Sequence, residues 1–442
     1  MSKNCKIKLR VSMKKLLTII AILVVASPVL FARPQYSILQ TYGTKCSNCH
    51  VNNNYGGMRN SGGFIARNSI SVIKPEWLGM EGLYDFLSDK NSYMDDAVQW
   101  GIDFRYQNAR WGQTQKLSET RDTNDVPVRP TLERKGMIMQ LMPYLNIQAT
   151  EWFRIDGSYN FSYDIEPNMR YKGQQPGYVR ATFDIMDDLP TVSVGYFPPD
   201  MALDYDDHTM LVRTVAGKGR SNPLVPADYA ELGIQFNYDR LDWLSASLGF
   251  FESKNMGDLT LEDNSPVVNK DAISTVLNIN VNSELPGGFI GFAGMTNYLN
   301  GNLKTDNGIY LGNGYYNITS FFLGVGMSDN FALLAEYMTS NKQLATAAEL
   351  NGAVETTYRS VNNLLLELTY QLIEPVNIFA RYETAATKIK ATGETYEANQ
   401  YVFGSHIYLL PYIDLLPEYR IYDRGEVSGY SSQWAFQIHI FY

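Results

Sequence analysis

Two cysteines and a histidine near the amino end of the chain form the tightest chemical pattern in the sequence. Cys46, Cys49 and His50 stand in the spacing C-x-x-C-H, within the stretch KCSNCH. Two thiols at this spacing can add to the two vinyl groups of a haem, and the adjacent histidine can coordinate the iron from one face. The pattern therefore predicts one covalently bound haem c, with His50 as the proximal ligand of its iron.

Three other interpretations of this pattern stay open, and each has less support. A structural zinc site needs four protein ligands, and residues 33–90 contain no second cysteine pair and no histidine besides His50. A redox disulfide usually accompanies a thioredoxin-like βαβ pattern, which this sequence lacks. A chance match is improbable because Cys5 is the only further cysteine, and it falls in a segment that we expect to be removed.

Coordination by His50 would leave the sixth position of the iron to be filled. Residues 33–94 are too few, and too rich in asparagine and glycine, to form a complete class I cytochrome, in which a downstream methionine takes that position. Met58 follows His50 by only eight residues, so it reaches the opposite face of the same haem awkwardly. Met80 has a longer reach.

Two further candidates for the sixth ligand, His208 and His439, belong to the rest of the chain. The alternative for His208 is a solvated loop residue, and the alternative for His439 is a residue of a channel wall. The iron could also have no sixth ligand from the protein.

The first 32 residues have the order of a secretory signal peptide. Six basic residues and no acidic residue accompany the apolar run LLTIIAILVVASPVLF, which the small residue Ala32 follows. Met13 is an alternative start, and cleavage near Ala26 or Ala32 would release the mature chain. Removal of this segment lowers Lys+Arg from 37 to 31 against 46 Asp+Glu, a net charge of −15. We expect no nucleic-acid partner for so acidic a chain, and cations are favoured.

From about residue 97 onward, apolar and polar residues alternate with a period of two. Successive side chains of a β-strand point to opposite faces, so each such segment indicates an amphipathic strand. In WFRIDGSYNFSY, one face would collect Phe153, Ile155, Tyr159, Phe161 and Tyr163.

The last alternating segment, SQWAFQIHIFY, supports a membrane-embedded sheet. An apolar final strand that ends in an aromatic residue resembles the insertion signal of outer-membrane barrel proteins. Ala435, Gln437 and His439 would face inward in this strand. The opposite, lipid-facing set would be Trp434, Phe436, Ile438, Ile440 and Tyr442.

The connections between strands alternate between short turns and long loops of roughly 9 to 31 residues. This alternation with an even strand count is typical of a bacterial outer-membrane barrel, whereas a secreted β-sandwich or solenoid would need a second layer to cover the apolar faces. The first strand would begin, and the last strand would end, on the short-turn, periplasmic side of the barrel. The expected strands are 97–110, 135–148, 152–163, 177–186, 190–198, 230–238, 243–251, 272–281, 287–298, 315–326, 331–339, 359–372, 376–386, 397–409, 413–422 and 432–442.

We therefore expect an all-β fold, a 16-stranded antiparallel transmembrane outer-membrane β-barrel over residues 95–442. A signal peptide (1–32) and a short monohaem cytochrome c-like segment (33–94) would precede it. Sixteen strands enclose an aqueous lumen, whose wall would be wetted by charged residues of both signs. These inward residues are Arg154, Asp156, Arg180, Asp184, Glu336, Glu367, Arg381, Glu383, Glu418 and Arg420.

The stretch FARPQYSILQTYGTKCSNCHVNNNYGGMRNSGGFIAR resembles the start of the fused cytochrome-porins of iron-oxidising bacteria. The matching residues are Phe31, Ala32, Arg33, Cys46, Cys49, His50, Gly56, Gly57, Gly62, Gly63 and Phe64. The proline- and leucine-rich stretch that usually follows is missing here. The resemblance implies one haem ahead of a barrel and electron transfer at the outer membrane.

The longest connection, about 199–229, is the third long loop, which folds inward as the constriction of sixteen-stranded porins. The run VGYFPPDMALDYDDHTMLVRT resembles the phosphate-selective porin family. Its acidic DYDD, with Asp204, Asp206 and Asp207, departs from a preference for phosphate.

We expect an outer-membrane monohaem cytochrome-porin that carries electrons between an extracellular donor or acceptor, such as ferrous iron, and periplasmic carriers. Such a chain would be an electron-transfer protein, Fe(II) oxidase-like rather than a classical enzyme. Its partners would be outer-membrane lipid, periplasmic cytochromes and extracellular metal ions, with the haem segment on the periplasmic side or within the lumen. The alternatives are a solute-conducting porin with a haem-bearing plug and a barrel scaffold for a separate multihaem cytochrome.

Overall fold

The computed structural model describes sixteen stretches of the chain. The haem-attachment pattern, Met58, His208 and the acidic run 204–207 lie outside them. The described residues are 70–90, 92–94, 97–113, 134–165, 174–186, 188–201, 210–216, 223–226, 228–256, 273–285, 289–300, 316–326, 330–345, 356–389, 393–423 and 430–442.

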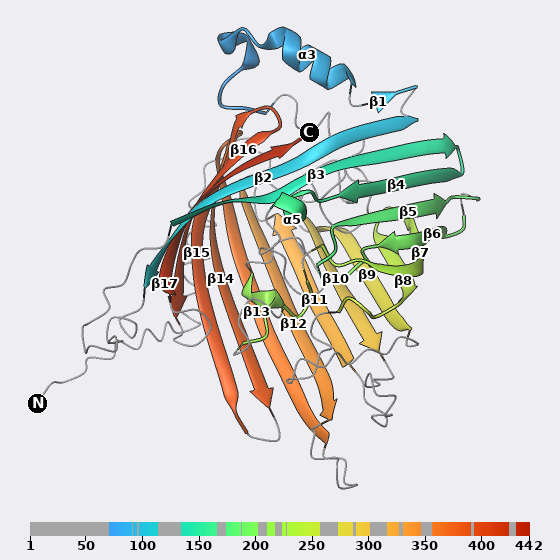
Figure 1. The fold of residues 1–442 in the computed structure, drawn as a ribbon, viewed down its shortest axis with the longest axis vertical. Coiled ribbons are helices and arrows are strands. Elements are labelled where there is room, and N and C mark those ends of the chain that lie inside the picture. The colour runs from blue at the N-terminus through green and yellow to red at the C-terminus, as the bar shows by residue number, and fades with distance from the viewer. Residues whose placement is uncertain are drawn as a thin grey trace, which may run out of the picture.

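Sixteen long strands form one closed antiparallel barrel (Figure 1). They are β2 (Val98–Gln113), β3 (Arg134–Thr150), β4 (Phe153–Tyr159), β5 (Gly177–Phe183), β6 (Thr191–Phe197), β7 (Glu231–Leu241), β8 (Leu244–Phe251), β9 (Ser274–Leu285), β10 (Phe289–Asn300), β11 (Tyr316–Gly326), β12 (Phe331–Ala345), β13 (Thr356–Ile373), β14 (Val376–Ile389), β15 (Thr395–Leu410), β16 (Ile413–Asp423) and β17 (Tyr430–Phe441). Each pairs with the next along the chain, and β17 pairs with β2 to close the sheet. The predicted number of sixteen barrel strands and their antiparallel order are confirmed.

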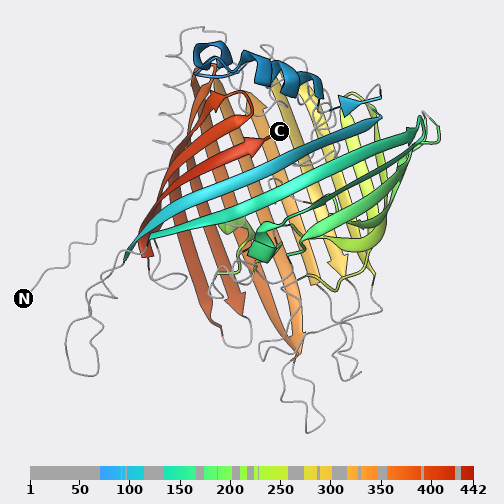
Figure 2. The same cartoon turned by 45° about the horizontal axis from the view of Figure 1, so that its top comes forward.

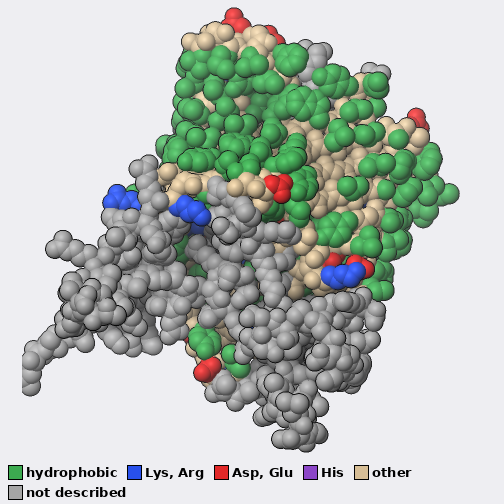
Figure 3. Space-filling view, in the orientation of Figure 1, with side chains coloured by type: hydrophobic (Ala, Val, Ile, Leu, Met, Phe, Trp, Pro, Cys, Tyr) green, Lys and Arg blue, Asp and Glu red, His purple; other side chains and the backbone are tan. Residues whose placement is uncertain are grey.

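The alternation of side chains explains why these segments form a barrel wall. On β13, Leu365 and Glu367 are buried inside, while Leu364, Leu366 and Leu368 lie on the outer face. The outer faces of the other strands are likewise apolar, and Figure 3 shows hydrophobic side chains over much of the surface toward the short-turn end. A band of this kind requires a lipid surface or a partner to cover it.

The wall is not equally tall all round. Strands β4, β5 and β6 have seven residues each, whereas β13 has 18 and β15 has 16. Figure 2 shows the short strands on one side of the barrel and the long ones on the other.

A small cap covers the short-turn end of the barrel. It consists of the 3-10 helix η3 (Pro75–Leu78), the helix α3 (Glu81–Lys90) and the two-residue strand β1 (Ser92–Tyr93), which pairs with the start of β2. Figures 1 and 2 both place α3 across this end, above β16. Among the residues that the structure describes, none of the helices combines the length and the apolar character needed to cross a bilayer.

The predicted strand 152–163 is wrong in its second half. Strand β4 ends at Tyr159, and Ser162–Ile165 form the short helix α5 instead. The side chain of Asn160 accepts hydrogen bonds from the backbone N–H of Leu141, 3.0 Å away, and of Ser162, 3.2 Å away. An asparagine that bonds to nearby backbone in this way competes with the strand ladder, so Phe161 and Tyr163 do not continue the outer face of β4.

The prediction that Tyr442 faces lipid is also wrong. Its ring is buried with Phe441 in an apolar cluster at the short-turn end, and its hydroxyl donates to the carbonyl oxygen of Leu87 on α3 at 2.8 Å. Burial, with the neighbouring Tyr412 and Tyr93, raises the pKa of Tyr442 to about 12. The residue therefore joins the final strand to the cap.

Candidate functional site

Two of the four predicted sixth-ligand candidates, Met80 and His439, are described by the structure. Met80 lies between η3 and α3, on the cap, and its backbone N–H donates to the carbonyl oxygen of Pro75 at 3.0 Å. Its side chain is half-buried. Cys46, Cys49 and His50 fall on undescribed residues, as do Met58 and His208, so their predictions stay as predictions.

His439 lies on the inner face of β17, near the short-turn end. Its Nε2 is 3.1 Å from Oδ1 of Asp103 on β2, and its ring centroid is 5.1 Å from that of Phe441. The expected inward direction of His439 is confirmed.

A second inward histidine, His406 on β15, was missed in the sequence. Its Nδ1 is 2.6 Å from Oδ2 of Asp414 on β16, and its ring centroid is 5.6 Å from that of Phe379. The alternation of the predicted strand 397–409 places His406 on the inner face with Gln400, and that signal could have found it.

The two histidines and two aspartates form a row across four adjacent strands. His406 on β15 contacts Asp414 on β16, Asp414 is the register partner of His439 on β17, and His439 contacts Asp103 on β2. We call these four residues the His–Asp row. Among the described residues, no group of three or more His, Cys, Asp and Glu side chains is arranged to hold a metal ion.

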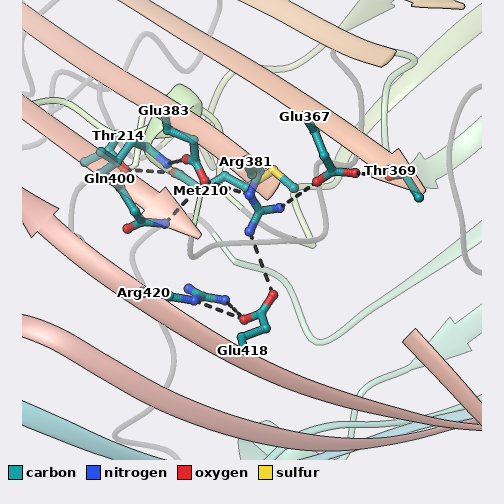
Figure 4. Close-up of polar contacts among 10 residues, drawn as sticks. Met210, Thr214, Glu367, Thr369, Arg381, Glu383, Gln400, Glu418 and Arg420 are labelled. Atoms are coloured by element: carbon teal, nitrogen blue, oxygen red, sulfur yellow. Dashed lines mark hydrogen bonds and ion pairs between the residues drawn. The ribbon is translucent and has the colours of Figure 1, made fainter. Parts of the chain in front are cut away.

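Further from the short-turn end, the inner face carries a network of buried charges centred on Arg381 of β14 (Figure 4). Its guanidinium lies 2.9 Å from Glu383, 3.6 Å from Glu367 and 3.9 Å from Glu418. Arg420 on β16 bonds to Glu418 in turn, with its Nε 3.0 Å from the carboxylate. We call these five residues the Arg381 network. The charges are thus paired across β13, β14 and β16. The prediction was only that they would line a water-filled channel.

The other predicted inward charges are also engaged. Arg180 on β5 makes a two-pronged contact with Asp156 on β4, with both N···O distances 3.0 Å and both side chains buried. Asp184 contacts Arg240. Glu336 accepts a hydrogen bond from Ser320 at 2.5 Å.

The long connection between β6 and β7 reaches the inner wall, as predicted for a constriction. Its 3-10 helix η5 (Leu211–Arg213) is fully buried. The Leu211 N–H donates to the carboxylate of Glu383. The Asn363 amide on β13 donates to the carbonyl oxygens of Val212 and Thr214, each at 2.8 Å. The described part of this connection is therefore fastened to the Arg381 network and its neighbours.

Apolar contacts reinforce these hydrogen bonds. Val212, Val215 and Leu224 of the inserted connection share a buried cluster with inward residues of the wall. The wall residues of that cluster include Phe292, Phe322, Leu334, Met338 and Leu365. Burial of apolar surface of this extent makes the inserted connection part of the core of the barrel.

Neither a protein-family model nor a curated protein sequence matches the chain. Solved structures do match it. The outer membrane channel DcaP of Acinetobacter baumannii superposes with a TM-score of 0.51 over 78% of this chain and 97% of that chain, at 11% identity. The chain has the fold of an outer-membrane porin.

Two more porins of known structure resemble this porin fold. OprB of Pseudomonas putida gives a TM-score of 0.49 at 10% identity, covering 83% of this chain and 97% of that chain. OmpF of Salmonella typhi gives 0.48 at 13% identity, covering 79% and 99%. The likeness to DcaP is a likeness of fold.

Proposed function

We propose that this chain is an outer-membrane cytochrome-porin that carries electrons between an extracellular donor or acceptor, such as ferrous iron, and periplasmic carriers. The supporting observation is the combination of a C-x-x-C-H pattern with a closed barrel, whose short-turn mouth binds residues 70–73 of the same chain. The role would be electron transfer, Fe(II) oxidase-like rather than that of a classical enzyme. The proposed location is the bacterial outer membrane.

The described end of the patterned segment is bound at the short-turn mouth. The side chain of Ile70 packs in a buried cluster with Tyr408 and Phe441, which face inward on β15 and β17. The N–H groups of Val72 and Ile73 donate to carbonyl oxygens at the end of β15, at 2.8 and 3.0 Å. Residues 70–73, which follow the haem pattern in the sequence, are thus bound at the inner side of the rim.

The length of the segment permits placement of His50 within the barrel or below it. Ile70 lies twenty positions after His50, and an extended chain spans at most about 3.5 Å per position, or about 70 Å in total. An insulating hydrocarbon layer of about 30 Å must be crossed. A redox centre tethered to the rim can therefore serve either end of the barrel.

The residues present fit the proposed cofactor by the chemistry of their donors. Cys46 and Cys49 offer two thiols at the spacing of covalent attachment, and His50 offers an imidazole nitrogen beside them. A bound haem c would supply a one-electron iron centre. The protein would fix its position through the two thioether bonds, orient it through His50 and exclude lipid by the closed wall.

The charge of the chain agrees with cationic donors and carriers. The mature chain would carry a net charge of −15, from 31 Lys+Arg and 46 Asp+Glu. A negative field raises the local concentration of cations and speeds their association. Ferrous ions outside and basic electron carriers in the periplasm are thus suitable partners.

Purified full-length protein tests the proposal. Haem staining after denaturing electrophoresis and the optical spectrum of the reduced protein should both report one haem c per chain. The double variant Cys46→Ala/Cys49→Ala should lose both signals and stop electron transfer across proteoliposomes. Ser47→Ala, between the two cysteines, is the matched control and should behave like wild type. An intact rate in the double variant, or a wild type without haem, would refute the proposal.

A second candidate, a solute-conducting porin whose haem segment acts as a plug, draws on the inserted connection. Its fastening by Glu383 and Asn363 gives the barrel the kind of internal constriction that a porin uses. Planar bilayer recordings separate the two candidates. Large steady currents through intact protein would favour the porin, and absent currents the electron carrier.

A further inference from the structure

The cap carries exposed apolar side chains at the short-turn end of the barrel. Trp77 and Leu78 of η3 are 72% and 52% exposed, and Leu83 and Phe86 of α3 are 49% and 54% exposed. We call these four residues the cap patch. Exposed apolar side chains gathered in this way mark a surface that contacts a membrane or a protein.

The sides of α3 separate its residues by kind. Successive residues of a helix are rotated by about 100°, so Leu83 and Phe86 share one side, and Tyr84 and Leu87 share the side next to it. Tyr84 and Leu87 are half-buried against the barrel. Asp85 is exposed on the remaining, charged side. The apolar surface of α3 is therefore wider than the part that the barrel covers.

Helix α3 lies on the rim beside outward-facing residues of the wall. It packs against the same buried cluster as Trp100 and Ile102 of β2. These two residues alternate with the inward-facing Asp103, so they belong to the outer side of the strand. Trp100 also contacts the ring of Tyr442, at 5.1 Å between centroids, and the Tyr442 hydroxyl bonds to Leu87 of α3. The helix is thus joined to the side of the wall that lipid surrounds.

Two tryptophans mark the level of the membrane boundary at this end of the barrel. Trp152, between β3 and β4, and Trp243, between β7 and β8, are both exposed. Tryptophan collects where headgroups meet hydrocarbon, and membrane barrels carry such a girdle at each boundary. The cap begins at the same level, because the N–H groups of Val72 and Ile73 bond to carbonyl oxygens at the end of β15. The cap patch therefore extends the aromatic girdle.

The charges of the cap suit a lipid surface on one side and water on the other. Figure 3 shows hydrophobic side chains continuing from the wall up to the cap, and acidic side chains at the outermost edge of this end. The exposed acids of the cap are Glu76, Glu81 and Asp85. Because anionic lipids attract basic segments rather than acidic ones, a zwitterionic headgroup is the suitable partner.

We propose that the cap patch lies in the headgroup region of the periplasmic leaflet and binds zwitterionic phospholipid, with α3 as an in-plane amphipathic helix that anchors the rim. The continuity of the patch with the lipid-facing wall favours lipid over a second copy of the chain or a soluble protein. The inference rests on the outer-membrane location within the proposed function and does not involve the haem.

Fluorescence of the full-length protein in vesicles of phosphatidylethanolamine and phosphatidylcholine tests the contact. Acyl chains brominated close to the headgroup quench tryptophans at that depth. The part of the emission that Trp77→Phe lacks should be quenched by these lipids and protected from iodide in the water. Trp243→Phe is the matched control, and it should lose an equally quenched part of the emission.

Hydrogen exchange in the same vesicles measures the anchoring. The double variant Leu83→Ser/Phe86→Ser should raise the exchange rate of the α3 amides about tenfold, because its side chains are no longer held in lipid. Asp85→Asn, on the charged side, is the matched control and should keep the wild-type rate. The heat-dependent gel shift of folded barrels shows that each variant has folded.

The outcomes separate this inference from the proposed function. Emission of Trp77 that iodide quenches and brominated lipid does not, or an unchanged exchange rate in the serine variant, overturns the assignment. Shielding of Trp77 that disappears when the protein is diluted in lipid also overturns it, in favour of a second copy. A protein without haem whose Trp77 is quenched by lipid refutes the proposed electron transfer and leaves this inference standing.

Discussion

Two regions of the inner wall differ in how their polar residues are bound. In the Arg381 network, ion pairs cross from strand to strand and hold the inserted connection. The opposite side, on β6 to β9, carries neutral residues that we call the amide wall: Ser193, Gln235, Asn237, Ser247 and Asn278. There Gln235 donates to Asn237 on the same strand at 2.6 Å, and the contact from Asn237 to Ser193 is 3.4 Å.

The difference teaches that one alternating pattern produces two kinds of wall. Buried charges need partners, so the Arg381 network ties three strands and the inserted connection to one another. Neutral amides and hydroxyls can be satisfied singly, and the Oδ1 atom of Asn278 has no partner among the described residues. We expect the first wall to be sensitive to single substitutions and the second to be tolerant of them.

The largest effect should follow from Arg381→Met. Loss of the guanidinium leaves Glu367, Glu383 and Glu418 as buried acids with no shared cation, which should lower the free energy of unfolding by about 3–5 kcal/mol. Urea unfolding in detergent measures it. Arg110→Met, at an exposed position, is the control and should change stability by less than about 0.5 kcal/mol. Equal losses in the two variants would contradict the comparison.

The next effect concerns the inserted connection. Asn363→Ala removes the donor to three carbonyl oxygens, of Leu211, Val212 and Thr214. The local cost of about 2 kcal/mol corresponds to a roughly thirtyfold larger opened fraction. Trypsin should then cleave at the buried Arg213, as mass spectrometry of the fragments would detect. Asn377→Ala, on the same wall, should leave Arg213 protected, and cleavage there in both variants would argue against a specific anchor.

A smaller effect should follow from Tyr442→Phe, which touches neither wall. Loss of the hydroxyl bond to Leu87 should weaken docking of the cap by about 1 kcal/mol. The raised pKa favours the neutral phenol in the folded state. Docking is therefore fully stable below about pH 10, the usual value for tyrosine, and is lost as pH rises toward about 12. Hydrogen exchange of α3 measures both changes, and a pH response that persists in Tyr442→Phe would assign it to another group.

The smallest effect is expected in the amide wall itself. Asn278→Ala removes an amide whose oxygen is already without a partner among the described residues, so the free energy of unfolding should change by less than about 1 kcal/mol. If Asn278→Ala lowered the free energy of unfolding as much as Arg381→Met, the two walls would be equally sensitive to substitution. Urea unfolding under the same conditions gives the answer.

Much of the barrel could be predicted because the alternation of apolar and polar residues is visible within each strand. In residues 359–372 the sequence alone shows which side chains of β13 face inward, because neighbouring residues such as Leu366 and Glu367 point to opposite faces of a strand. The end of β4 could not be predicted in this way, because the side chain of Asn160 bonds to Leu141 on another strand. A hydrogen bond between residues that are far apart in the sequence does not change the alternation of apolar and polar residues, so the sequence does not reveal it.

The candidate site divides along the same line. The C-x-x-C-H pattern is a contiguous signal, so the haem prediction needs no structure. The partnership of His406 with Asp414 depends on the turn between β15 and β16, where the pairing shifts in register between Tyr408 and Leu410. The alternation of residues predicts that Arg381 and the three glutamates of its network face inward. Only the register of the strands shows that they contact one another.

The unequal strands have a consequence for the surrounding bilayer. At about 3.3 Å per residue and a tilt of about 45°, the 7 residues of β5 rise only about 16 Å, whereas the 18 of β13 rise about 42 Å. A hydrocarbon layer of uniform thickness, near 25–30 Å, cannot match both flanks. Lipids beside β4–β6 must thin, or the barrel axis must lean. The molecule would therefore deform its membrane on one side only, and so acquire a preferred direction within the plane.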